Sequence, residues 1–188
     1  MRPGVLQGLT SSLIFGLLSF VPNRADAETL RAKLDGYQVV STQSTRGSGS
    51  FRATLDRNAK LIRYELAYDN LEGDILQSHI HFGRPGTNGG IVAFLCTNLG
   101  NEPPTVAHPK PKCPGPRQGV VRGIIKPGDV IYLKFPNVFP DTQLIEPGEF
   151  NELAAAIDAG AAYVVVHTEA QPLGELRGDI PGKGRNRP

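Results

Sequence analysis

The stretch FRATLDRNAKLIRYELAY, residues 51–68, decides the fold class. Apolar and polar residues alternate in its first half and again in its second half, with apolar side chains at Phe51, Ala53, Leu55, Ile62, Tyr64, Leu66 and Tyr68. The polar run at residues 56–60 between the two halves is typical of a turn. A period of two places alternate side chains on opposite faces of a strand. The stretch therefore predicts an antiparallel hairpin with one buried face and one wet face.

Similar short strands are predicted along most of the remaining chain, bounded by glycine, proline and asparagine. We expect them at residues 30–34, 75–82, 91–96, 119–125, 162–167 and 174–180. The segment 127–145 is mixed, because strand-like Val130–Leu133 precedes two prolines. Strands of this length and spacing predict an all-β protein, an antiparallel β-sandwich of Greek-key type.

One short helix is expected at residues 149–159. It begins just after Pro147 and stops at Gly160, which are typical residues for the start and the end of a helix. Its apolar residues fall on one face, at Phe150, Leu153, Ala154 and Ile157. The helix is therefore predicted to pack that face against the sandwich.

Residues 1–27 have the pattern of a signal peptide. Arg2 supplies a positive charge, residues 11–21 are mostly apolar, and Ala25-Asp26-Ala27 is a cleavage site of small residues. A membrane anchor is the alternative, but the apolar run is shorter than the roughly 18 to 20 residues that a spanning helix needs. We expect cleavage after Ala27 and a secreted or periplasmic product with no membrane span.

The expected mature chain is one domain with a short tail. Removing residues 1–27 leaves 18 basic and 17 acidic residues, a near balance that argues against a nucleic-acid partner. Residues 28–180 suit a single domain. The basic tail, residues 181–188, has no apolar side chain beyond its prolines, so we expect it to be disordered.

Cys96 and Cys113 are the two cysteines of the chain. In an exported protein a lone pair of cysteines is more often a disulfide than a metal or redox site. The loop between them is rich in proline and asparagine and cannot form regular structure by itself. We therefore expect a Cys96–Cys113 bond that holds this loop.

Four short motifs together resemble the CHRD domain, a family named after the extracellular regulator chordin. They are SHIHFG at residues 78–83, NGG at 88–90, YVVVHT at 163–168 and GELRGD at 174–179. The resemblance runs from about Leu30 to Ile180 and implies an all-β extracellular domain without established catalytic activity. Val165 stands where the family often has asparagine, and Asp179 stands where it often has glutamine.

The histidines allow two interpretations. Strand geometry puts His79 and His81 on one face, and a hairpin closed by residues 169–173 would set His167 opposite Glu175 with Arg177 diagonally near. In the structural interpretation, Glu175 orients an imidazole and accepts from Arg177, so that the five side chains form a polar cluster. In the metal interpretation, His79, His81 and His167 hold zinc or copper, with Glu175 as a further ligand or a supporting group.

Catalysis is not expected. Alternation points Ser78 to the strand face opposite His79, so no serine nucleophile lies beside a histidine. The acidic residues fall mostly at turns and strand exteriors, where they would not form a paired-carboxylate site.

The sequence thus predicts a non-catalytic binding or structural module that needs no cofactor, with a zinc or copper protein as the alternative. Its partner would be an unknown extracellular ligand or protein, bound through the loops. The glycine-rich segment 83–90 lacks the lysine of a phosphate loop and is predicted to form a turn between strands. Its Arg84 is expected to be a solvated charge, with a contact to an acidic partner as the alternative.

Overall fold

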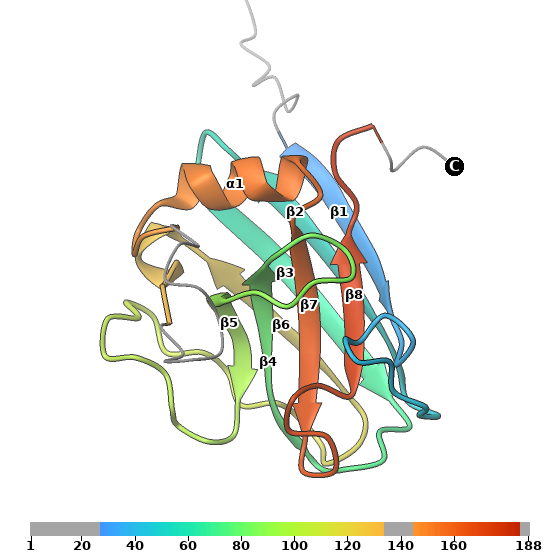
Figure 1. Ribbon diagram of the computed structural model, residues 1–188. Coiled ribbons are helices and arrows are strands. Elements are labelled where there is room, and N and C mark those ends of the chain that lie inside the picture. The colour runs from blue at the N-terminus through green and yellow to red at the C-terminus, as the bar shows by residue number, and fades with distance from the viewer. Residues whose placement is uncertain (1–26, 134–144, 185–188) are drawn as a thin grey trace, which may run out of the picture.

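The computed structural model describes residues 27–133 and 145–184 and arranges them as two antiparallel sheets packed face to face (Figure 1). The first sheet has the strand order β1 (Ala27–Leu34), β2 (Ser48–Asp56), β3 (Leu61–Asp69) and β6 (Gly119–Ile125). The second sheet has the order β5 (Ile91–Thr97), β4 (Ile75–Phe82), β7 (Ala162–Thr168) and β8 (Leu176–Ile180). The predicted all-β antiparallel sandwich with one short helix is confirmed.

The hairpin of residues 51–68 forms as predicted, with Phe51 opposite Leu66 and Leu55 opposite Ile62. These side chains are fully buried between the two sheets. Burying one such side chain stabilises a protein by about 1.5 to 3 kcal/mol. Tyr64 also joins the two layers, because its hydroxyl donates a hydrogen bond to Leu95 O on β5 (2.5 Å).

The outer faces of the two sheets differ. On the first sheet, outward side chains alternate with buried ones and are mostly exposed to water. On the second sheet, β5 and β7 are buried on both faces. A small second apolar cluster of Ile91, Phe94 and Ile131 covers part of that outer face. Polar groups on this face must therefore find partners inside the protein.

The helix α1 (Phe150–Asp158) lies across one end of the sandwich (Figure 1). Its four predicted apolar residues are buried, and Gly160 ends it with a φ of 67°. Asp158 in its last turn forms an ion pair with Arg57 in the turn between β2 and β3 (2.5 Å). A short 3₁₀ helix, η1 (Pro127–Asp129), forms the start of the segment 127–145, which was predicted to be mixed.

Val130–Leu133 does not form a strand, although Ile131 N–H donates to Val92 O (3.0 Å). Residues 1–26 of the expected signal peptide, residues 134–144 and residues 185–188 lie outside the described part of the chain. At the start of the tail, the N–H and the ammonium group of Lys183 both contact Asp158. Among the described residues, no helix has the length and apolar character needed to cross a membrane.

The disulfide Cys96–Cys113 is present, as predicted. It joins the end of β5 to the loop that leads to β6. Asn98 supports the junction, because its side chain accepts from Cys113 N–H (3.1 Å) and donates to Ile75 O (3.0 Å). Further along this loop, Lys110 forms a buried ion pair with Asp129 (3.0 Å).

Reducing this disulfide should destabilise the protein by about 3 kcal/mol, because the bond restricts a loop of this length in the unfolded chain. Urea unfolding with and without a reductant measures the change. Intact mass should show alkylation of both cysteines only after reduction. Two thiols that react in freshly isolated protein would contradict the prediction.

Candidate metal centre

Three histidines meet on the outer face of the second sheet. His79 and His81 come from β4, and His167 comes from the neighbouring strand β7, where it pairs with Gln77, two positions along β4 from His79. Their ring centroids are 5.0 to 5.9 Å apart. One potential ligand nitrogen from each ring lies within 4.8 Å of the others, and the side chains are 0%, 7% and 8% exposed. The structure thus brings together the three residues that the sequence singled out.

Backbone carbonyls fix the protonation of two rings. His81 Nδ1 lies 2.9 Å from Gly89 O, and His167 Nδ1 lies 3.0 Å from Pro172 O. A carbonyl oxygen only accepts, so each Nδ1 must carry a proton and donate it. Nε2 of both rings therefore carries a lone pair, which is the form that binds a metal.

The third ring shares a hydrogen bond with its neighbour. His79 Nδ1 lies 3.2 Å from His167 Nε2, and because the latter has only a lone pair, His79 is the donor. Two buried nitrogens, His79 Nε2 and His81 Nε2, have no hydrogen-bond partner among the described residues. Buried polar atoms without a partner are uncommon and ask for an explanation.

Aromatic rings enclose the histidines. The ring of His79 meets Phe94 edge to face, with centroids 4.4 Å apart. His81 stacks on Tyr163 at 5.0 Å, and the guanidinium carbon of Arg177 lies 3.6 Å from the centroid of the same tyrosine. The hydroxyl of Tyr163 also forms hydrogen bonds with the backbone of Gly89, and both the arginine and the histidine pack on its ring. These contacts exclude water from the three rings.

Burial keeps the imidazoles neutral. Loss of hydration lowers the pKa of His81 to about 3 and that of His167 to about 4. The pKa of His79 is lowered well below its usual value, first by burial and then by the charges that His167 and His81 would carry. At neutral pH the cluster therefore offers uncharged nitrogen atoms.

The predicted polar cluster of five side chains differs in one respect from the structure: among the described residues, Glu175 forms no hydrogen bond or ion pair with an imidazole or with Arg177. Its carboxylate accepts from Thr45 Oγ (2.8 Å), Thr168 Oγ (2.7 Å) and Glu72 N–H (2.7 Å), with a longer contact to Gly73 N–H (3.4 Å). Arg177 binds Asp179 (2.7 Å). The polar residues thus form two separate groups.

The cause is an irregularity at the start of β8. Leu176 pairs with Val166, yet Glu175 N–H also donates to Val166 O (2.8 Å), so two residues oppose one. Gly174, with a φ of 131°, makes this backbone path accessible. A bulge of this kind turns a side chain to the other face. Glu175 therefore shares a face with Thr168 and not with His167.

The sequence interpretation missed Tyr163, Phe94 and the carbonyls of Gly89 and Pro172. Tyr163 had a signal, because it lies on the same face of its strand as His167. The carbonyls had none, since their positions depend on how two loops close over the sheet. The fourth histidine, His108, lies elsewhere and contacts Asp129 (3.0 Å).

The fold and the site define an antiparallel β-sandwich with a buried cluster of three histidines. Residues 30–180 match the CHRD domain family, which confirms the resemblance, and the chain belongs to that family. No curated protein and no solved structure gives a significant match to the chain.

Acid should destabilise the metal-free protein. Each histidine has a lower pKa folded than unfolded, so below pH 6.5 the unfolded state binds more protons, and stability falls as the pH drops from about 6.5 toward 4. The slope should reach about 1.4 kcal/mol per pH unit for each histidine. Urea unfolding at several pH values with a chelator present measures it. His81→Asn should reduce the slope, and an equal slope in that variant would contradict the prediction.

Glu175→Ala should cost about 1 to 3 kcal/mol of unfolding free energy, because it leaves the buried hydroxyl of Thr168 and two partly buried donors, Thr45 Oγ and Glu72 N–H, without an acceptor. The matched control is Glu152→Ala on the exposed side of α1, which should change stability by less than about 0.5 kcal/mol. Equilibrium denaturation of both variants and the parent tests the pair. Equal stabilities would show that Glu175 does not hold this junction.

Proposed function

We propose that this protein is an exported, non-catalytic CHRD domain that binds one zinc or copper ion through His79, His81 and His167. The proposal rests on one observation: three neutral imidazoles converge, and carbonyls hold the far N–H groups of His81 and His167. Histidines that bind metals commonly donate their other N–H to such a carbonyl or to a carboxylate. That support orients the ring and increases its basicity.

The distances suit such an ion. Ligand bonds of about 2.0 to 2.1 Å in a tetrahedral site place two nitrogens roughly 3.3 Å apart. His79 Nδ1 and His167 Nε2 are 3.2 Å apart. A metal ion could be held by His79 Nδ1 and His167 Nε2 if the proton on His79 Nδ1 moved to Nε2 of the same ring. Nε2 of His81, which carries a lone pair, would be the third nitrogen ligand.

The donor chemistry favours zinc or copper over hard cations. Imidazole suits zinc and copper, whereas calcium and magnesium prefer oxygen ligands. Glu175, the carboxylate that the sequence predicted as a further ligand or supporting group, instead accepts from hydroxyl and amide donors on the other face of the sheet. The ligand set of described residues is therefore nitrogen alone.

Two features support a non-catalytic, exported protein. Ser78 Oγ donates to Val165 O (2.7 Å) and both cysteines form the disulfide, so these hydroxyl and thiol groups are not paired with a histidine as nucleophiles. The disulfide itself fits an oxidising compartment outside the cytoplasm.

A second candidate is a purely structural histidine cluster in a module that binds an extracellular ligand through its loops. The direct hydrogen bond between His79 and His167 favours it, because this bond links β4 to β7 without any ion. The two candidates differ in whether His81 Nε2, which has no hydrogen-bond partner among the described residues, gains a metal ion as its partner.

Metal analysis separates the two candidates. Protein isolated from its native compartment without a histidine tag should contain close to one zinc or copper ion per chain. A His79→Ala, His81→Ala double variant should lose the metal and the thermal stabilisation that added metal provides. His108→Ala, which removes a histidine outside the cluster, should keep both.

Metal-free protein that shows no thermal shift with zinc or copper would support the structural candidate instead. Equal metal content in the double variant would show that the ion binds elsewhere. Equilibrium binding with the metal ions alone gives the affinity, so the result does not depend on knowing a partner.

A further inference from the structure

The outer face of the first sheet carries a row of charged side chains that spans all four strands. The register aligns Arg31 of β1 with Arg52 of β2, Glu65 of β3 and Arg122 of β6. Neighbouring strands lie about 4.8 Å apart, so the row extends over roughly 14 Å. Three of its four members are cations.

The two adjacent rows add Lys33 and Arg63. We call the five cations the cationic face: Arg31, Lys33, Arg52, Arg63 and Arg122. With Glu65 as the one carboxylate of these three rows, the face carries a net charge of +4, whereas the whole chain carries +2. Asp56 and Asp69 lie just beyond, at opposite ends of the strands. The positive charge is thus concentrated on one side of a nearly neutral protein.

Most of this charge is not neutralised within the protein. All five cations are exposed, and Arg122 forms an ion pair with Glu65 (2.6 Å). Within residues 27–133 and 145–184, the side chains of Arg31, Lys33, Arg52 and Arg63 form no ion pair. Like charges directly opposite each other, as Arg31 and Arg52 are, destabilise a sheet. Because this arrangement does not help the protein to fold, we look for its role in binding a partner.

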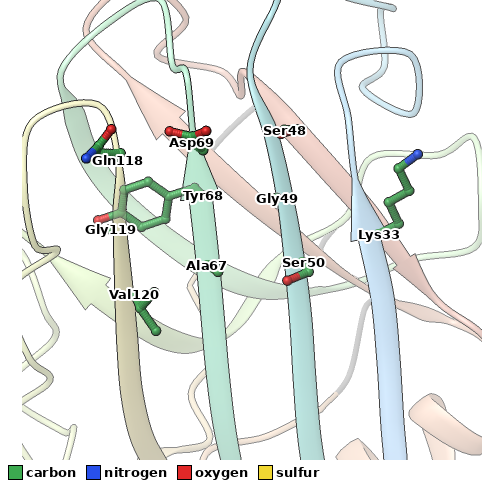
Figure 2. Close-up of a pocket in the computed structure, with 10 residues that line it drawn as sticks. All are labelled: Lys33, Ser48, Gly49, Ser50, Ala67, Tyr68, Asp69, Gln118, Gly119 and Val120. Carbon is green, nitrogen blue, oxygen red and sulfur yellow. The ribbon is translucent and has the colours of Figure 1, made fainter.

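The surface between the cations is shallow and carries small hydroxyl side chains beside apolar ones such as Val120. Beside Lys33 it forms an open hollow whose floor is made of small residues such as Gly49, Ser50 and Ala67 (Figure 2). Hydroxyl groups of Thr29 and Thr54 lie in the row on the other side. None of the three central rows has an aromatic outward side chain, so bases have no surface on which to stack.

We propose that the cationic face binds an acidic polysaccharide outside the cell. Guanidinium groups pair with carboxylate or sulfate in a forked geometry, and a row of them suits a polymer that repeats such groups. The serine and threonine hydroxyls between them can bond to sugar hydroxyls. A nucleic acid is disfavoured by the missing aromatic platform, and a membrane by the flat strand surface, which offers no amphipathic helix to insert.

Binding to polygalacturonate, a polymer of uronic acids, tests the proposal with the full mature chain. Affinity measured by calorimetry at low salt should fall steeply as salt is added. An Arg31→Gln, Arg52→Gln double variant should bind about tenfold more weakly or worse. The control, Arg84→Gln with Lys112→Gln, removes the same charge from exposed cations off this face and should bind like the parent.

Thermal unfolding of the same variants separates binding from folding. Relieving the Arg31–Arg52 repulsion should leave the double variant at least as stable as the parent. Equal losses of affinity in the double variant and the control, no binding to polygalacturonate, or tighter binding to DNA or to vesicles of anionic lipid would each overturn the proposal. None of these results depends on the histidine cluster, so the metal proposal stands or fails separately.

Discussion

The antiparallel pairing of β4 with β7 at the centre of the second sheet is the constraint on which the rest of the structure depends. It sets Ile80 opposite Val164 in the core and His79 opposite Val165 on the outer face. A slip of one residue would send the imidazoles into the core and the apolar side chains outward. The hydrophobic pattern of the two strands forbids that slip. The position of the histidines is therefore a consequence of how the core packs.

Burial of the outer face makes the surrounding loops part of the site. The loop of residues 83–90 crosses β7 and β8 (Figure 1), and Arg177 donates to two of its carbonyls, Thr87 O (2.7 Å) and Arg84 O (3.2 Å). The same loop supplies Gly89 O, which fixes the proton of His81. Arg177 thus influences His81 indirectly, by holding the loop and by packing on the tyrosine that stacks against the histidine.

Those parts of the fold that depend on local pattern were predictable from the sequence. Period-two alternation predicted the strands, and with them the shared face of His79 and His81; the apolar face and Gly160 predicted α1. The register of the last hairpin was also predictable as far as Leu176. Glu175 was not, because its direction depends on a bulge that the backbone at Gly174 permits. The state of the imidazoles was not predictable either, since it depends on carbonyls brought in by distant loops.

The two outer faces place different demands on charged groups. On the wet face of the first sheet, water screens Arg31 from Arg52, so permanent cations can stand opposite each other at a modest cost. On the dry face of the second sheet, an added positive charge would meet little screening. Arg177 is a permanent cation close to the histidines, and Asp179 lies 2.7 Å from its guanidinium. A metal cation bound by the histidines would therefore lie near the Arg177–Asp179 ion pair and not near an unpaired guanidinium. Because Asp179 offsets the charge of Arg177, electrostatic repulsion does not prevent a cation site here.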